Sequence, residues 1–304
     1  MTKLGNLAAC AALGLFASTG SQAGALEGPQ TLVHDGLERR YVVRLPDDMR
    51  ADSKLPLVLV LHGGGGNAAN VERMTGFTAK ARSEHFIVAY PEGSGFLAGR
   101  LLTWNAGHCC GFAMKTDVDD VGFIRALIDD LVARYPVDAR RIYATGMSNG
   151  GMMTHRLGIE LADRLAAIAP VVATVFGDEA APAQPVPALM INGLKDENVP
   201  YHGGSPGGPG ARAWDGTPAL PAEAQFEFWM RANGCTLATR RIDEGRWLKW
   251  SDRCLSRDDT RLYVLKDNGH AWPGGAPGRA RGDQPGTALN ATDLIWEFFA
   301  EHPK

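Results

Sequence analysis

The chain has 304 residues, of which 45% are hydrophobic and 21% are charged, and its net charge is -3. It contains no Lys/Arg block or basic face, so the charge pattern of a nucleic-acid-binding protein is excluded. No internal apolar run reaches about 18 residues, so we expect no membrane span.

The N-terminal region, residues 1–25, has the composition of a secretory signal peptide. Lys3 precedes an apolar stretch at 7–17, and small residues then lead to a cleavage site near Ala25. A lipoprotein signal with an acylated Cys10 is the alternative, but the apolar run before Cys10 is too short for it and continues past it. We therefore expect an exported protein.

Strand-like and helix-like stretches alternate along the remainder of the chain. The run LPLVLVL at 55–61 is typical of a central strand buried on both faces. Regular alternation predicts a mostly parallel sheet with helices on both faces, in one catalytic domain over 26–304. The predicted strands are 41–45, 55–61, 86–90, 141–145, 167–172, 186–191 and 260–265; the predicted helices are 70–83, 118–135, 149–161, 223–232 and 292–300.

Two stretches rich in Gly and Pro, 202–221 and 273–287, are predicted to be long surface loops. In such a sheet the loops at the carboxyl ends of the strands surround the site, so both loops are expected to shape access to it.

Ser148 lies in the pattern Gly146-Met147-Ser148-Asn149-Gly150, which fits G-x-S-x-G. A predicted strand precedes it and a predicted helix follows, which is the setting of a nucleophile elbow. Flanking glycines avoid clashes with the neighbouring strand and helix, and the helix N-terminus favours developing negative charge. Ser148 is therefore interpreted as a nucleophile rather than as a serine in a structural turn.

A serine nucleophile needs a base and an orienting acid, which in this fold follow in the chain order Ser, Asp/Glu, His. Asp196 follows the predicted strand 186–191, and His270 follows the predicted strand 260–265. We predict Ser148, Asp196 and His270 as a catalytic triad. The rival side chains are Asp178, Glu197, Asp252 and Asp267 as acids, and the loop residues His108 and His202 as bases.

A glycine-rich segment, His62-Gly63-Gly64-Gly65-Gly66, directly follows the predicted central strand. Such a loop supplies backbone N–H groups to an oxyanion in lipases and esterases, and we predict Gly64 and Asn149 as the two donors. A phosphate-binding loop is excluded because no Gly-Lys-Ser/Thr follows.

Four cysteines remain outside the signal peptide: Cys109, Cys110, Cys235 and Cys254. An even number in an exported chain favours disulfides over a metal site, and no C-x₂-C spacing is present. Three connectivities stay open, one of which pairs Cys109 with Cys110 and Cys235 with Cys254. We expect no metal and no cofactor.

The segments LHGGGGNA, WNAGHCCG, VDDVGFIRALI, IYATGMSNGGMM, KDENVPYHGG and GHAWPGG resemble the polyhydroxybutyrate depolymerase-like esterases, a family similar to secreted feruloyl and acetylxylan esterases. The resemblance covers residues 30–300 and implies an α/β-hydrolase fold. It places the triad at Ser148, Asp196 and His270 and the oxyanion donors at Gly64 and Asn149. No linker or substrate-binding domain is expected after residue 300, and the oxyanion loop is all glycine; both features argue against an insoluble polyester substrate.

Three residues are predicted to contact the substrate: Trp104, Trp272 and His62. Trp272 lies two residues from His270, and Trp104 precedes the two adjacent cysteines in another active-side loop. Aromatic walls suit feruloyl rings, sugars and polyester methyl groups alike. Trp214 fits a wall of the site and a loop anchor equally well.

The sequence thus predicts a secreted serine carboxylesterase whose partner is an ester substrate, with no obligate protein partner. Feruloyl or acetyl esters of plant polysaccharide are the first substrate hypothesis, and a 3-hydroxybutyrate polymer or oligomer is the second. A serine peptidase and a non-catalytic binding protein on the same fold are the alternatives from other classes.

Overall fold

The computed structural model describes residue 1 and residues 27–304, except 48, 50–52, 98, 209, 236–239, 254–258 and 279–281. Apart from Met1, the predicted signal peptide lies outside the described residues. The part of the chain that is described contains no helix long and apolar enough to span a bilayer.

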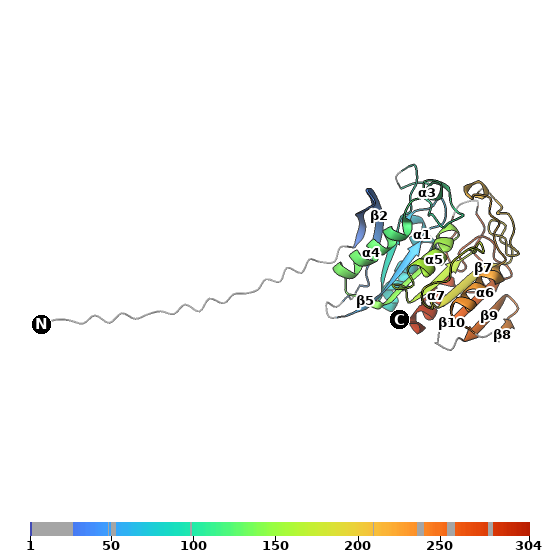
Figure 1. Cartoon of the computed structure of the whole chain (residues 1–304). Helices are drawn as coiled ribbons and strands as arrows, with labels where there is room; N and C mark the ends of the chain where they lie inside the picture. The colour runs from blue at the N-terminus through green and yellow to red at the C-terminus, as the bar shows by residue number, and fades with distance from the viewer. Residues whose placement is uncertain are drawn as a thin grey trace.

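The described strands form one ten-stranded sheet in the order β1-β2-β4-β3-β5-β6-β7-β10-β9-β8. Figure 1 shows β2 towards one side of the molecule and β8 at the other. The six strands from β4 to β10 pair in parallel, and the two strands at each edge pair antiparallel. The predicted mostly parallel sheet is confirmed. The strands are β1 (Gly28–His34), β2 (Leu37–Arg44), β3 (Leu55–Leu61), β4 (Ile87–Pro91), β5 (Val137–Met147), β6 (Ala167–Val171), β7 (Ala188–Gly193), β8 (Arg240–Asp243), β9 (Trp247–Arg253) and β10 (Asp259–Leu265).

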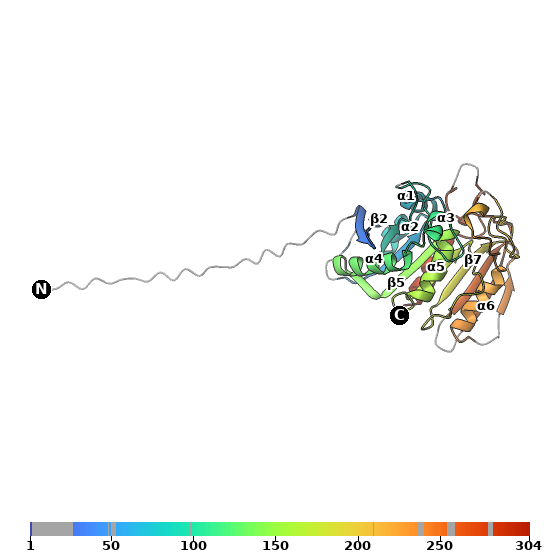
Figure 2. The ribbon, with the colours of Figure 1, turned by 45° about the horizontal axis from the view of Figure 1, so that its top comes forward.

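Helices cover both faces of this sheet, as predicted. Helices α4, α5 and α6 pack on one face of the sheet, and Figure 2 shows them lying across it. Helices α1, α2 and α7 pack on the other face. The helices are α1 (Ala68–Thr75), α2 (Phe77–Glu84), α3 (Gly111–Lys115), α4 (Asp120–Arg134), α5 (Asn149–Glu160), α6 (Ala222–Ala232) and α7 (Ala291–Glu301), with a 3-10 turn η1 (Ala211–Ala213).

The central strand β3 explains why the core has two halves. All seven of its residues are buried, because helices lie above and below it. Successive side chains point to opposite faces, so Leu57 and Leu59 join the core under α4 and α5, while Val58 and Val60 join the core under α1 and α7. This strand ends directly before the glycine-rich loop.

Several expectations about single elements were wrong. The predicted helix 70–83 is two helices, because Gly76 has a φ of 70° and ends α1 with its N–H bonded to the Glu72 carbonyl. The strands β1, β8 and β9 and the short helix α3 were not predicted, since their sequences lack an apolar face of clear period.

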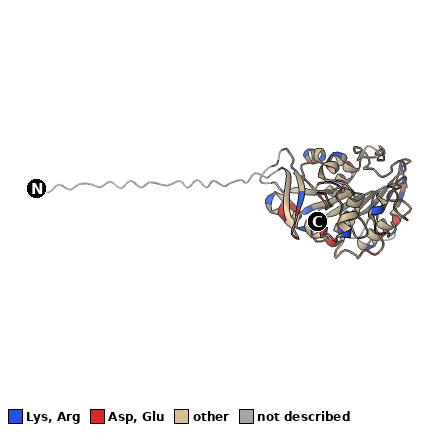
Figure 3. Cartoon of the chain, turned by 90° about the horizontal axis from the view of Figure 1, so that it is seen from above, with Lys and Arg blue, Asp and Glu red and all other residues tan. Residues whose placement is uncertain are grey.

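The predicted loops 202–221 and 273–287 contain, within their described residues, no helix or strand beyond η1. Lys and Arg residues are interspersed with Asp and Glu residues over the fold (Figure 3), in keeping with the small net charge.

Candidate active site

Ser148 occupies a strained turn between β5 and α5. Its φ of 57° and ψ of -125° lie outside the regions that a serine ordinarily adopts. Such strain persists only where the surrounding structure enforces it, and a nucleophile elbow is one of the places where it occurs. The turn places the Ser148 hydroxyl directly after the carboxyl end of β5.

The glycines of the elbow allow close approach of the backbone. A Cβ on Gly150 would overlap the carbonyls of Leu61 and His62, and a Cβ on Gly146 would lie 2.5 Å from the Gly150 carbonyl oxygen. The first turn of α5 therefore packs directly against the end of β3, which brings the elbow beside the glycine-rich loop.

Replacing Gly150 with alanine is expected to destabilise the protein by about 1–3 kcal/mol, because the backbone would have to move to admit the methyl group. The midpoint of urea unfolding measures this effect. Gly210→Ala is the matched control, because Gly210 has a φ of -81° and open space around a Cβ; its effect should be within about 0.5 kcal/mol. Equal stabilities of the two variants would contradict this packing.

His270 and Asp196 come from the carboxyl ends of two adjacent parallel strands, β10 and β7. His270 Nε2 lies 2.9 Å from Ser148 Oγ, and His270 Nδ1 lies 2.8 Å from Asp196 Oδ2. A carboxylate only accepts hydrogen bonds, so Nδ1 carries the proton and Nε2 accepts the serine hydroxyl. The structure brings the three predicted triad residues into one hydrogen-bonded line.

The loops that carry the acid and the base are tied to each other. The other oxygen of Asp196 accepts the backbone N–H groups of Asn198 and Val199, each at 2.9 Å, which fixes the carboxylate. The buried Asn268 accepts the N–H of Lys195 at its backbone carbonyl, at 3.0 Å, and so joins the acid loop to the histidine loop. Hydrogen bonds therefore connect both loops beside the triad.

Asp283 is a site residue that sequence reasoning missed. Its carboxylate accepts the backbone N–H of His270 at 2.5 Å. It lies in the loop 273–287, which carries no pattern that would have distinguished this aspartate from its neighbours.

The glycine-rich loop lies directly against the elbow. A Cβ on Gly63 would be 3.5 Å from the Ser148 Cβ, and a Cβ on Gly64 would be 3.6 Å from the Asn149 Cβ. Gly65 N–H donates to the Leu102 carbonyl at 2.7 Å, which holds the loop in place. The two predicted oxyanion donors, Gly64 and Asn149, therefore belong to adjacent segments of the backbone.

The prediction that Trp104, Trp272 and His62 contact the substrate is corrected by the structure. All three side chains are 0% exposed and lie in the core rather than on a wall of the site. The Trp272 indole N–H donates to Thr292 Oγ1 at 3.0 Å, and its ring packs edge-on against Phe77. An aromatic residue close in sequence to a catalytic group can equally be an anchor for the loop.

His62 is a neutral structural residue. Burial lowers its pKa to about 4. Its Nε2 accepts the Gly93 N–H at 3.0 Å, so Nδ1 is the protonated nitrogen and donates to the Gly63 carbonyl at 2.9 Å. The ring thus braces the start of the glycine-rich loop.

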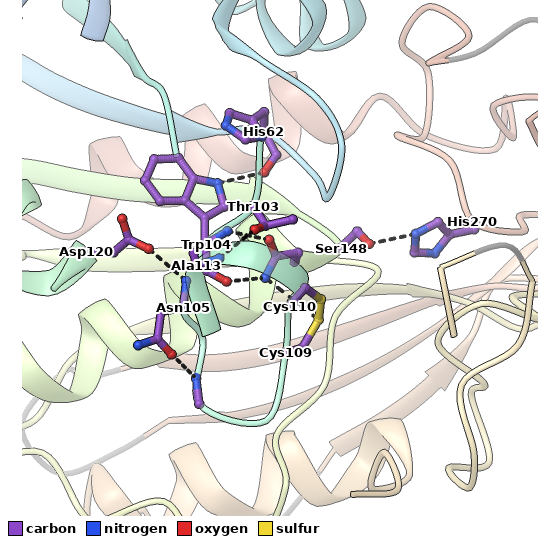
Figure 4. The surroundings of a disulfide bond; sticks show 12 residues. His62, Thr103, Trp104, Asn105, Cys109, Cys110, Ala113, Asp120, Ser148 and His270 are labelled. Atoms are coloured by element: carbon purple, nitrogen blue, oxygen red, sulfur yellow. Dashed lines mark hydrogen bonds between the residues drawn. A yellow bond between two sulfur atoms is a disulfide. The ribbon is translucent and has the colours of Figure 1, made fainter. Parts of the chain in front are cut away.

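Cys109 and Cys110 form a disulfide beside the elbow (Figure 4). Cys109 Sγ lies 3.8 Å from Asn149 Nδ2, the residue that follows Ser148. Cys235 is also disulfide-bonded, whereas Cys254 lies outside the described residues. Of the pairings that the sequence left open, the structure therefore contains the one between the adjacent Cys109 and Cys110, next to the candidate nucleophile.

The rival acids and bases have other positions. Asp267 pairs with Arg246 on the exterior, and His202 is exposed beside Tyr201. Asp178 pairs instead with His108, whose second ring nitrogen faces Asp215. Of the acids considered, Asp196 is the one that the structure places against His270.

His108 links three loops at the carboxyl side of the sheet. Its Nε2 lies 2.8 Å from Asp178 and its Nδ1 lies 2.7 Å from Asp215, and its ring packs on Phe176, which contacts Trp214 edge-on. With a carboxylate at each ring nitrogen, the charged imidazolium is favoured. The hydrogen bond to Asp178, followed by that to Asp215, raises the pKa of His108.

This arrangement predicts a pH dependence of stability. Because the pKa of His108 is raised in the folded state, the stabilisation by its ion pairs is complete below about pH 6.5. This stabilisation is lost as the pH rises through the pKa of His108 in the folded protein. His108→Gln should therefore lower the urea midpoint at about pH 5.5 more than at about pH 9, by a small amount because the ion pairs are partly exposed. Asp178→Asn should show the same trend. An equal loss at both pH values would contradict it.

Comparison with known proteins identifies a family and two relatives to which this chain is similar. Residues 39–222 match the sequence profile of a family described as esterase PHB depolymerase. The chain is 32% identical over 240 residues to feruloyl esterase B of Piromyces equi, covering 77% of this chain and 42% of that protein. It is 29% identical over 273 residues to a protein of Aspergillus niger named "Probable feruloyl esterase C", covering 88% of this chain and 86% of that one. The chain thus spans less than half of the first relative and most of the second.

The acetyl xylan esterase from Aspergillus awamori is similar in structure. It matches with a TM-score of 0.60 at 13% identity, over 90% of this chain and 99% of that chain. At this identity the likeness concerns the fold alone, and with the parallel sheet it confirms the predicted α/β-hydrolase fold.

Proposed function

Because the chain belongs to the esterase PHB depolymerase family, we propose that it acts as a serine carboxylesterase through Ser148, His270 and Asp196. The family match covers more than half of the chain and agrees with the resemblance seen in the sequence. The domain is therefore that of a carboxylic ester hydrolase. The observation that carries the mechanism is the hydrogen-bonded line from Ser148 Oγ through the imidazole to the buried Asp196 carboxylate.

In this mechanism Ser148 Oγ attacks the ester carbonyl and its proton passes to His270 Nε2. Asp196 holds the imidazole in the tautomer that can accept this proton, and stabilises the imidazolium once it forms. The tetrahedral intermediate then expels the alcohol, which takes the proton from His270. Water, activated by the same imidazole, hydrolyses the acyl-enzyme and regenerates Ser148.

The negative charge on the carbonyl oxygen is held by the backbone N–H groups of Gly64 and Asn149. The contact between the two segments supports this assignment, and so does the position of Asn149 at the N-terminus of α5, where the helix dipole favours an anion. Preformed donors of this kind stabilise charge that appears only during the reaction.

We propose feruloyl or acetyl esters of plant polysaccharide as the substrates. The names of the two relatives, feruloyl esterase B and "Probable feruloyl esterase C", support the feruloyl esters. Acetyl esters are included because the sequence segments resemble a family similar to acetylxylan esterases. A polyhydroxybutyrate polymer or oligomer is the second candidate, supported by the description of the family.

Purified protein assayed side by side on methyl ferulate, acetylated xylan and polyhydroxybutyrate tests the substrate proposal, with Ser148→Ala as the blank. The largest kcat/KM is expected on methyl ferulate or acetylated xylan. Release of 3-hydroxybutyrate at a higher rate than ferulate or acetate would replace the first candidate with the second.

We also propose that residues 1–25 direct export of the protein. The charged start, apolar stretch and small residues before Leu26 support this, and an oxidising compartment would suit the disulfide at Cys109 and Cys110. N-terminal sequencing of the protein recovered outside the cytoplasm should begin near Leu26. Protein retained in the cytoplasm with Met1 intact would contradict export.

A further inference from the structure

Trp104 makes a set of contacts that the proposed mechanism does not use. Its backbone N–H donates to Asn149 Oδ1 at 2.7 Å, and its backbone carbonyl accepts Asn149 Nδ2 at 3.0 Å. The amide side chain of Asn149 therefore clamps one residue at both of its backbone groups. Trp104 and Asn149 are 0% and 1% exposed, so water does not compete for these bonds.

The indole of Trp104 reaches in the other direction. Its N–H donates to the backbone carbonyl of His62 at 2.9 Å, and its ring packs on the His62 imidazole with the centroids 5.0 Å apart (Figure 4). His62 opens the glycine-rich loop and braces Gly63 through its ring. One residue is thus bonded both to the segment that contains Gly64 and to the segment that contains Asn149.

The loop that carries Trp104 is itself held firmly. Cys110 N–H donates to the Trp104 carbonyl at 2.9 Å, next to the disulfide. The N–H of Asn105 donates to the buried Asp120 carboxylate at 2.7 Å (Figure 4), and that carboxylate pairs with the buried Arg39. These bonds fix the position of the Trp104 backbone. Trp104 can therefore hold the segments of His62 and Asn149 at a set distance from each other.

We propose that Trp104 is a positioning residue that sets the spacing between the two halves of the oxyanion hole, together with the side chain of Asn149. Asn149 then has two separate functions: its backbone N–H binds the oxyanion, and its side chain holds Trp104. This inference rests on the proposed function, since it concerns the same reaction.

The primary test is Trp104→Phe, which keeps a buried ring but removes the donor to the His62 carbonyl. Small displacements of preorganised donors are costly, so kcat should fall about ten- to a hundredfold while KM stays within about twofold. The matched control is Trp229→Phe, because Trp229 is equally buried and donates its indole N–H to His155 Nδ1, in the core beneath α6. This control should lose a comparable amount of thermal stability and keep its kcat.

A transition-state mimic separates positioning from general damage. Phenylboronic acid adds to Ser148 Oγ as the serine proton passes to His270, and the resulting anionic tetrahedral boronate places one of its boron-bound hydroxyl groups in the oxyanion hole. Its inhibition constant should rise in Trp104→Phe by the same factor as kcat falls, and should not change in Trp229→Phe.

A second pair of variants covers the case in which Trp104→Phe does not fold. Asn149→Asp keeps the backbone N–H but turns a carboxylate oxygen towards the Trp104 carbonyl, so kcat should again fall with KM unchanged. Asn233→Asp is its control, because Asn233 clamps the N–H and carbonyl of Val186 in the same way, at 2.8 and 2.9 Å, away from the site. The effects of Trp104→Phe and Asn149→Asp should be less than additive when combined, since both break one connection.

The proposal would be overturned if folded Trp104→Phe or Asn149→Asp had the same kcat and the same boronate affinity as its control variant. The same holds if KM rises while kcat is unchanged. These outcomes are distinct from failure of the proposed function, which would appear as esterase activity surviving in Ser148→Ala.

Discussion

Replacement of Ser148 by alanine is expected to lower kcat for ester hydrolysis by about 10⁶-fold, because no other hydroxyl lies in the elbow to form the acyl-enzyme. The fold should be retained, since among the described residues the hydroxyl that alanine removes is hydrogen-bonded to His270 alone. Release of p-nitrophenol from p-nitrophenyl acetate measures the loss, and circular dichroism checks the fold.

Ser83→Ala is the matched control for this experiment. Ser83 is exposed on α2, where its hydroxyl donates to the Lys80 carbonyl of the same helix. This variant should retain the activity of the unaltered protein. If Ser148→Ala retained more than about one hundredth of the activity, a triad mechanism at this site would be rejected.

Asp196→Asn is expected to lower kcat by about 10⁴-fold with little change in KM. One oxygen of Asp196 is held by two backbone N–H groups, so in the variant the amide oxygen would keep those bonds and the NH₂ group would face His270. The imidazole would then present an acceptor at Nδ1 and a proton at Nε2, the wrong tautomer for accepting the proton of Ser148. Steady-state kinetics on p-nitrophenyl acetate measures the change.

Asp267→Asn provides the comparison for the acid. Asp267 also follows β10 and was a rival acid in the sequence, but its carboxylate pairs with Arg246 at the exposed surface. Its replacement should leave kcat within about twofold. A loss in Asp267→Asn as large as that in Asp196→Asn would mean that the acid has been wrongly assigned.

The arrangement of the triad could be anticipated from the sequence because each residue follows a strand of clear pattern. Strand β3 is a continuous apolar run, and the strands that precede Ser148, Asp196 and His270 are nearly as distinct. In a parallel sheet the carboxyl ends of the strands meet at one edge, so residues that immediately follow them converge whatever their separation in the chain. The strand pattern therefore contained the information that brings these three residues together.

The surroundings of the triad could not be anticipated in this way. Whether Trp104 faces a substrate or the core depends on its bonds to His62 and Asn149, which are distant in the sequence. Both outcomes suit a large side chain that is apolar apart from one donor. The same holds for Asp283, whose role arises from a single contact with the backbone of His270.

The errors in the secondary structure have local causes. An isolated glycine costs a helix only about 1 kcal/mol, so Gly76 gave no decisive sign that it ends one helix and starts another. The edge strand β1 alternates between partly buried and exposed residues that are mostly polar or small, and its pairing with β2 holds it in the sheet. Neither feature can be read from periodicity alone.

The triad mechanism requires that Ser148 forms a covalent intermediate with the ester. The most direct measurement is to trap that intermediate with an aryl phosphonate ester and locate the phosphonyl group by peptide mass spectrometry. We expect one phosphonyl group per chain, on Ser148, with loss of activity in proportion to labelling. The variant His270→Ala should be labelled far more slowly. Labelling of a different residue, or full activity in a chain labelled at Ser148, would contradict the triad mechanism.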